Sequence, residues 1–245
     1  MKIQLEQTDS TNRVAKERAA EGAEEQTVIW ALQQQSGQGQ YGRVFASPLG
    51  GLYFSLILRP QLPFEALPLI TLATGLACRD VLSEVCSVHA QIKWPNDLYV
   101  DGKKVGGILC ENSIDARQGE CTATVIIGVG LNINSQVTDF PRELHSIVTT
   151  VLDATGRKVE LEALLEQLIK KIGTFVDELA INRDSLLDRW QNYDYLLNRS
   201  LRYINGEQII LGTGRGLAPD GRYRIVDASG APHAIIGGQL RPVDQ

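Results

Sequence analysis

The sequence predicts an α/β domain with a partly antiparallel sheet, followed by a small antiparallel β unit. Two observations support this prediction. Up to about residue 190, short runs rich in Val, Ile, Leu and aromatic residues alternate with segments that repeat apolar residues at helical spacing. Beyond that point the chain consists of short β runs separated by glycine turns, which we expect to form a small barrel docked on the larger domain. The predicted domains are residues 1–193 and 194–245.

The predicted elements follow from these patterns. Strands are expected where apolar runs are bounded mostly by Gly, Pro or Asn, at residues 27–32, 51–58, 89–93, 98–100, 104–110 and 122–128. Helices are expected at residues 12–21, which end before Gly22, at 64–84, and at 161–179, where apolar residues recur every three or four positions. The C-terminal β runs lie at residues 201–204, 208–214, 223–227 and 233–236. Strands and helices mixed in this order predict a layered sheet.

The composition limits the possible functions. With 24 basic and 29 acidic residues among 245, the net charge of −5 disfavours general binding of nucleic acid, which depends on clustered Lys and Arg. There is no apolar run of about 20 residues and no apolar stretch of the signal-peptide kind at the start, so we expect a cytoplasmic protein without membrane contact. The cysteines lack zinc-ligand spacing and are expected to be reduced, with no metal site: Cys78, Cys86, Cys110 and Cys121.

Asp101-Gly102, between two β runs, predicts a tight hairpin, because a type I′ turn needs positive φ at both central positions. A two-residue turn pairs Tyr99 with Lys104 and Asp97 with Gly106. Side chains alternate along a strand, so the predicted register places four residues on one face: Asp97, Tyr99, Lys104 and Gly106. Register alone leaves two interpretations of the Lys104–Asp97 pair, a ligand-binding cation beside a carboxylate or an ordinary surface ion pair.

Six segments, taken in order, resemble the biotin protein ligases. They are DSTN at 9–12, QQSGQGQYGR at 34–43, SPLGGLYFS at 47–55, KWPND at 93–97 with KVGGI at 104–108, GVGLNIN at 128–134, and GTGRGL at 212–217. The resemblance implies a catalytic domain like that of class II aminoacyl-tRNA synthetases, with a mixed sheet and flanking helices, and a C-terminal SH3-like domain. It also implies an ATP-dependent ligase that forms biotinyl-5′-AMP and transfers biotin to a lysine of the biotin carboxyl carrier protein of acetyl-CoA carboxylase.

The resemblance also implies the cofactors and the site. ATP, biotin and Mg²⁺ carried on ATP are expected, in a monomer or homodimer. Lys104 and Arg43 would offset the repulsion between the two anionic substrates, and Asp97 would position or deprotonate the carrier amine. The residues implied to bind biotin are Ser10, Thr11, Asn12, Gln34, Gly37, Gln38, Gln40, Lys104, Gly107, Gly128 and Gly130. Those implied to bind the nucleotide are Gln38, Gly39, Gln40, Arg43, Phe45, Asn96, Lys104 and Asn132, with Trp94 as a further contact.

Some interpretations stay open. Ser10 or Thr11 could simply cap the helix that follows. Gln38, Gln40 and Tyr41 stand where many members of the family carry arginines, which predicts a weaker hold on biotinyl-adenylate. The first motif begins at Asp9, so we expect a ligase without the N-terminal DNA-binding domain of some members. Two alternatives are a lipoate ligase-like enzyme and a non-catalytic biotin or nucleotide sensor.

Overall fold

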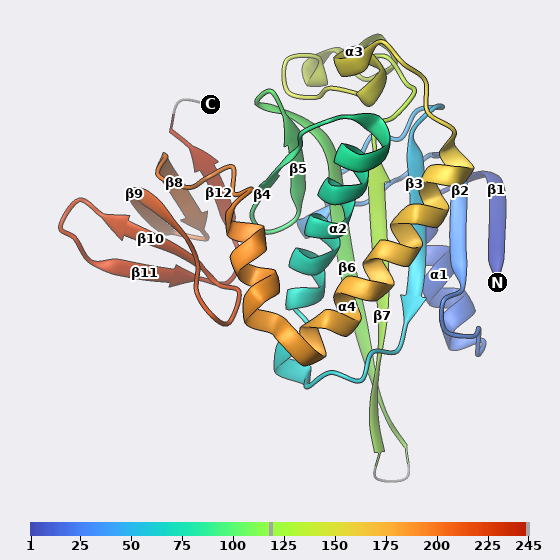
Figure 1. Ribbon diagram of the computed structural model, residues 1–245, viewed down its shortest axis with the longest axis horizontal. Coiled ribbons are helices and arrows are strands. Elements are labelled where there is room, and N and C mark those ends of the chain that lie inside the picture. Colours follow the sequence, from blue (N-terminus) through green and yellow to red (C-terminus); the bar gives the residue numbers. More distant parts are fainter. Residues whose placement is uncertain (118–119, 244–245) are drawn as a thin grey trace.

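The computed structural model describes residues 1–117 and 120–243, with side chains for all of these except 114–122. A seven-stranded sheet forms the large domain, in the order β1-β2-β3-β7-β6-β5-β4 (Figure 1). β1 and β2 run parallel and the other neighbouring strands antiparallel, which confirms the predicted mixed sheet. The strands are β1 (Lys2–Thr8), β2 (Val28–Gln34), β3 (Leu52–Leu58), β4 (Gln91–Lys93), β5 (Asp97–Val100), β6 (Lys103–Arg117) and β7 (Glu120–Leu131).

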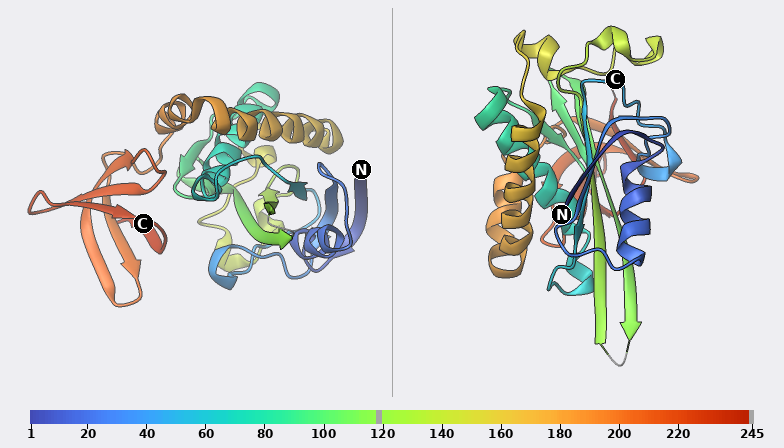
Figure 2. Two further views of the ribbon diagram at one scale, coloured as in Figure 1. Left: turned by 90° about the horizontal axis from the view of Figure 1, so that it is seen from below. Right: turned by 90° about the vertical axis from the view of Figure 1, so that its right-hand side faces the viewer.

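The two faces of this sheet are covered unequally. Helices α2 (Leu69–Cys86) and α4 (Leu161–Gln191) pack on one face and enclose the main apolar core, whereas α1 (Thr11–Ala20) covers the other face (Figure 2). The core under α1 is small and is formed by Ala15, Ile29, Ile57 and Ile126. The α1 face therefore leaves part of the sheet free for a site. The remaining helices are short: η1 (Gln40–Gly42), η2 (Phe64–Ala66), η3 (Val137–Asp139), η4 (Arg142–Leu144) and α3 (Val151–Thr155).

The prediction missed α3 and a C-terminal strand at Gln239–Pro242, and it also differs from the structure in the following elements. Strand β1 was not predicted, although Ile3 and Leu5 alternate with polar residues. The helix predicted at 64–84 is divided into η2 and α2, with Pro68 immediately before α2, where the fixed φ of proline suits a helix start. Helix α4 continues to Gln191, beyond the predicted end, through a non-helical residue at Asn182 with φ −145° and ψ 48°.

The predicted hairpin is present, but its register is partly wrong. Asp101 and Gly102 have φ of 48° and 76°, and Tyr99 pairs with Lys104 as predicted. Beyond this pair the register shifts, so that Asp97 pairs with Gly107 and not with Gly106. The shift leaves Val105 as one extra residue on β6, which is a β-bulge. Gly107 therefore takes the predicted place of Gly106 on the face that carries Lys104.

The C-terminal residues form a five-stranded antiparallel sheet, ordered β11-β10-β9-β8-β12, which confirms the predicted antiparallel β unit. Its strands are β8 (Ser200–Asn205), β9 (Gln208–Leu217), β10 (Tyr223–Asp227), β11 (Pro232–Ile235) and β12 (Gln239–Pro242). The sheet lies beside β4 and β5 (Figure 1). Trp94 joins the two units: its indole N–H donates to the Gly221 carbonyl at 3.1 Å, and its ring lies 5.8 Å from that of Tyr223. The boundary between residues 193 and 194 stays a prediction.

Two further findings concern the described residues. None of their helices combines the length and apolar character that a membrane crossing requires. The thiols of Cys78, Cys86 and Cys110 are unpaired, as predicted, and the side chain of Cys121 lies outside the described residues. Burial raises the pKa of the Cys110 thiol to about 12, so this group is not a nucleophile at neutral pH.

Candidate functional site

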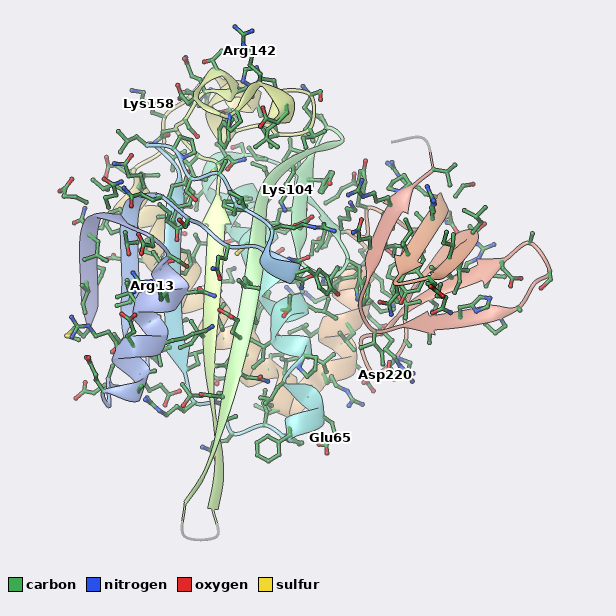
Figure 3. All side chains as sticks on the ribbon, turned by 180° about the vertical axis from the view of Figure 1, so that it is seen from behind. Arg13, Glu65, Lys104, Arg142, Lys158 and Asp220 are labelled. Carbon is green, nitrogen blue, oxygen red and sulfur yellow. The ribbon has the colours of Figure 1, made fainter. Side chains whose placement is uncertain are left out.

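A cavity opens on the α1 face, between the start of α1, the β5–β6 hairpin and the glycine-rich loop, which we define as residues 37–45. Figure 3 views this face, with Lys104 labelled. The cavity has a volume of about 150 Å³. The cavity is lined by Ser10, Thr11, Asn12, Gln34, Gln38, Gly39, Gln40, Arg43, Val44, Phe45, Asn96, Asp97, Lys104, Gly107, Ile108, Leu109, Gly128, Val129 and Gly130.

The centre of the cavity is the predicted pair of Lys104 and Asp97. The Lys104 ammonium donates to Asp97 Oδ1 at 2.5 Å, and the two side chains are 29% and 21% exposed. A Cβ added at Gly107 would lie 3.2 Å from Lys104 Nζ and 3.3 Å from Asp97 Oδ1, so the glycine leaves room for the pair. The ammonium also lies 5.7 Å from the centre of the Phe45 ring. The result is one cation held in place by its neighbours and open to a ligand.

Basic groups outnumber carboxylates around this pair. Burial lowers the pKa of Lys93 to about 8, with Asp97 opposing and Lys104, Arg241 and Arg43 adding to the decrease. The Lys93 ammonium donates to the Tyr99 hydroxyl at 3.3 Å. Within the part of the chain that the structure describes, the Arg43 side chain makes no hydrogen bond or ion pair. The excess of positive charge favours an anionic ligand.

Polar side chains at the start of α1 form the other end of the cavity. Gln34 Oε1 accepts from the Thr11 backbone N–H at 2.9 Å, and Gln34 Nε2 donates to Ser47 Oγ at 2.9 Å, so the amide has one fixed orientation. Ser10 occupies the N-cap position of α1, but its side chain makes no capping hydrogen bond. The Ser10 hydroxyl borders the cavity and is available to a ligand, which favours a binding role over capping.

Gly128 and Gly130, which the resemblance implies bind biotin, both line the cavity. A Cβ at Gly128 would lie 2.1 Å from Asn12 Oδ1, and a Cβ at Gly130 would lie 2.5 Å from the Phe45 ring. These glycines therefore make room for Asn12 and Phe45, which form the cavity wall. The Asn12 amide is itself held inside the protein, because its N–H groups donate to the Leu109 carbonyl at 3.1 Å and to a carboxylate at 2.9 Å.

Three predicted site residues are absent from the cavity wall. Gly37 begins the loop and is buried, and an added Cβ would meet the Phe45 carbonyl oxygen at 2.5 Å. Asn132 is buried beside β6, the strand that carries Lys104. Its backbone N–H donates to the Val105 carbonyl at 2.8 Å. Its Oδ1 is buried and has no partner among the described residues. The Trp94 side chain is turned toward the C-terminal sheet, so its contact with the nucleotide stays a prediction.

Other residues complete the wall or support it. Asn96 lines the cavity as predicted, and its Nδ2 donates to the Ile108 carbonyl at 2.7 Å. Ser55 and Glu111 were not predicted as site residues, yet both hydrogen-bond to Asn12. A serine inside an otherwise apolar strand was the signal that could have identified Ser55, because a buried hydroxyl needs a partner.

The glycine-rich loop is also tied to the C-terminal sheet. The Gly238 backbone N–H donates to the Tyr41 hydroxyl at 2.8 Å, and a Cβ at Gly237 would lie 2.9 Å from the same oxygen. Tyr41 stands at one of the positions where the sequence lacks an arginine. This contact links the position of the loop to the docking of the C-terminal strands.

Comparison with known proteins agrees with this geometry. The sequence model of the biotin/lipoate A/B protein ligase family matches residues 4–132. The bifunctional ligase/repressor BirA of Bacillus subtilis is 37% identical over 161 residues, which are 65% of this chain and about half, 49%, of that protein's length. A biotin--[acetyl-CoA-carboxylase] ligase of Paracoccus denitrificans is 31% identical over 93% of this chain and 91% of its own. The structure of a biotin protein ligase from Aquifex aeolicus in complex with biotin and ATP superimposes with a TM-score of 0.84, at 29% identity and 98% coverage of both chains.

Proposed function

We propose that this chain, which belongs to the biotin/lipoate A/B protein ligase family, is a biotin protein ligase. It condenses biotin with ATP to biotinyl-5′-AMP and pyrophosphate, and then transfers the biotinyl group to a lysine of the biotin carboxyl carrier protein of acetyl-CoA carboxylase. The observation that supports this most directly is the Lys104–Asp97 pair in a cavity with excess positive charge. Similar proteins named as biotin protein ligases support the assignment.

The first step brings two anions together. A biotin carboxylate oxygen attacks the α-phosphorus of ATP, a new O–P bond forms, and the bond to pyrophosphate breaks. Like charges a few Å apart repel by several kcal/mol at an effective dielectric of about 20, so a fixed cation between them lowers the barrier. Lys104, which lines the cavity, would be that cation. Arg43 supplies a second cation on the nucleotide side.

The nucleotide is held by the loop and by the ends of two strands. Gln38, Gly39 and Gln40 offer backbone and amide donors to phosphate oxygens, and Phe45 and Asn96 border the nucleoside. The buried, unpartnered Oδ1 of Asn132 would be satisfied by the exocyclic amino group of adenine. The described residues hold no cluster of three metal-ligating side chains, and we propose that Mg²⁺ arrives with ATP as part of the substrate.

In the second step the carrier lysine attacks the biotinyl carbonyl and AMP leaves. The amine must lose a proton, and Asp97 is the carboxylate at the cavity wall. Asp97 therefore positions the amine and accepts its proton. Its hydrogen bond to Lys104 keeps this carboxylate beside the cation that we propose holds the adenylate.

A lipoate ligase-like activity is the nearest alternative. Lipoate ends in a dithiolane ring without hydrogen-bond donors, whereas Ser10, Thr11 and Gln34 give this cavity a polar end suited to the ureido ring of biotin. A non-catalytic sensor is disfavoured because both Lys104 and Asp97 are in place. We further propose that the enzyme acts in the cytoplasm, as a monomer or homodimer.

Biotin-dependent exchange of labelled pyrophosphate into ATP tests the proposal. Lys104→Met should lower the exchange rate by about 10²–10³-fold, because it removes the fixed charge from the transition state. Lys103→Met is the matched control: this lysine is exposed on the opposite side of the same strand, and its loss should leave exchange unchanged. Exchange driven by lipoate and not by biotin would support the alternative enzyme. An undiminished rate in Lys104→Met would refute the assigned mechanism, and no exchange in the wild type would favour the sensor.

A further inference from the structure

A chain of hydrogen bonds runs beneath the cavity from Glu111 to Thr11. Glu111 Oε2 accepts from Asn12 Nδ2 at 2.9 Å, Asn12 Oδ1 lies 2.6 Å from Ser55 Oγ, and Ser55 Oγ lies 2.8 Å from Thr11 Oγ1. Ser55 is fully buried, and Thr11 and Asn12 are only 4% and 5% exposed. Lys16 holds the other carboxylate oxygen of Glu111 at 2.5 Å. The four linked side chains come from α1, β3 and β6.

The first link has one possible direction. The Glu111 carboxylate and the Leu109 carbonyl can only accept, and both contact Asn12 on the same side, so this side must be the amide nitrogen. Asn12 Oδ1 therefore faces Ser55. The amide cannot rotate freely, because it occupies the space beside Gly128. Even a methyl group added at Gly128 would clash with it.

The proton positions further along the chain follow. Asn12 Oδ1 cannot donate, so the single hydroxyl proton of Ser55 must point to it across the 2.6 Å contact. The 2.8 Å contact between Ser55 and Thr11 then needs the proton of Thr11. The remaining contact, Thr11 Oγ1 to Gln34 Oε1 at 3.2 Å, is the longest of the set. This contact does not need a proton between the two oxygens, since Gln34 Oε1 already accepts the Thr11 backbone N–H.

We propose that Ser55, anchored through Asn12 to Glu111, is a positioning residue that makes Thr11 a pure hydrogen-bond acceptor toward the cavity. A ligand must then present a donor to Thr11. A ureido N–H meets this requirement, and a dithiolane or a plain acyl chain does not. The inference rests on the proposed function, because it concerns how the same cavity selects a ureido-containing acid.

Equilibrium binding of biotin, measured by calorimetry without ATP, tests the inference separately from catalysis. Ser55→Ala should raise the biotin dissociation constant about tenfold, the value of one well-placed hydrogen bond. In the pyrophosphate exchange assay, the same variant should raise the biotin KM while kcat changes less than twofold. Thr27→Val is the matched control: it also removes one fully buried hydroxyl near the same sheet, one that has no partner among the described residues, and it should leave biotin affinity unchanged.

Two comparisons distinguish a directed hydrogen bond from general damage. In a Thr11→Val background, Ser55→Ala should have no further effect on biotin affinity, because the group that it orients is gone. The wild type and Ser55→Ala should also bind equally well a biotin that is methylated on the ureido nitrogen that contacts Thr11. An equal loss from Ser55→Ala with and without the Thr11 hydroxyl would overturn the inference. If biotin binds the wild type but exchange is absent, the ligase proposal fails while the inference is still tested; if biotin does not bind at all, both fail.

Discussion

The Tyr223 hydroxyl donates a 2.6 Å hydrogen bond to Asp194 Oδ2, at the point where α4 leads into the C-terminal sheet. The Leu196 backbone N–H donates to the other carboxylate oxygen at 2.8 Å. Burial raises the pKa of Asp194 to about 6, although both hydrogen bonds act in the opposite direction. The junction between the two parts of the protein therefore contains a carboxyl group that titrates close to neutral pH.

The pKa of Asp194 predicts how stability changes with pH. An unfolded aspartate has a pKa of about 3.9, so the folded state binds this proton more tightly. The resulting stabilisation is complete below about pH 4 and is lost as the pH rises through 6. Asp194→Asn removes the titration. The unfolding free energy of the wild type, relative to that of this variant, should fall by roughly 2 kcal/mol between pH 4 and pH 7 in urea denaturation.

Asp177→Asn is the control for this measurement, because Asp177 is an exposed carboxylate on α4. Its stability profile should follow that of the wild type across the same pH range. Parallel profiles for the wild type and Asp194→Asn would show that the junction carboxyl is not the group that titrates.

Asp97→Asn should separate the two half-reactions. The amide keeps the size of the carboxylate and leaves Lys104 in place, so biotin-dependent exchange should stay within tenfold of the wild type. Transfer of biotin to a carrier domain should fall by about 10²–10⁴-fold, the usual contribution of a positioned base. Single-turnover transfer from preformed adenylate measures this step, and a transfer rate equal to that of the wild type would remove Asp97 from it.

Gly128→Ala should damage the biotin end of the cavity. The new methyl group would lie 2.1 Å from Asn12 Oδ1, so the amide must move; we expect a loss of about 1–3 kcal/mol in stability and a higher biotin KM. Gly173→Ala is the matched control, since a Cβ there meets nothing within 4 Å inside α4. This second variant should gain up to about 1 kcal/mol and leave KM unchanged. A normal biotin KM in Gly128→Ala would contradict the assigned role of Asn12.

Gln40→Arg should slow the release of biotinyl-5′-AMP. Gln40 lines the cavity, and a guanidinium there would add a charge-assisted hydrogen bond that the amide cannot supply, which predicts about tenfold slower release. Gln35→Arg, at an exposed position outside the cavity wall, provides the comparison at equal net charge. Release can be followed by rapid dilution of the enzyme–adenylate complex. Unchanged release in Gln40→Arg would mean that the missing arginines do not weaken retention.

Local patterns predicted the parts of the site that depend on neighbouring residues. The Asp101-Gly102 turn determines that Lys104 and Asp97 face each other, and the turn has the positive φ values that its sequence requires. The resemblance implied that Gly128 and Gly130 lie in the biotin site. What approaches them could not be read from the sequence, because Asn12 and Phe45 come from segments more than eighty residues away.

Long-range packing explains the other differences. Trp94 lies within a recognised motif, yet its partner is the Gly221 carbonyl, which only the docked C-terminal sheet brings near. The orientation of the Thr11 hydroxyl depends on Ser55 and Glu111, two residues from different strands. A one-dimensional pattern contains no information on such contacts until the topology is known.

The bulge at Val105 has a consequence for the whole of β6. Before it, the even-numbered Lys104 points to the ligand side of the sheet; after it, Gly107 and Glu111, both odd-numbered, point there. The face on which the odd-numbered residues lie therefore changes once along β6, between the end that carries Lys104 and the end that carries Glu111. Deleting a single residue here would turn Glu111 toward α2 and put Asn112 in its place opposite Asn12, so the number of residues in this short stretch is constrained more tightly than their chemical identity.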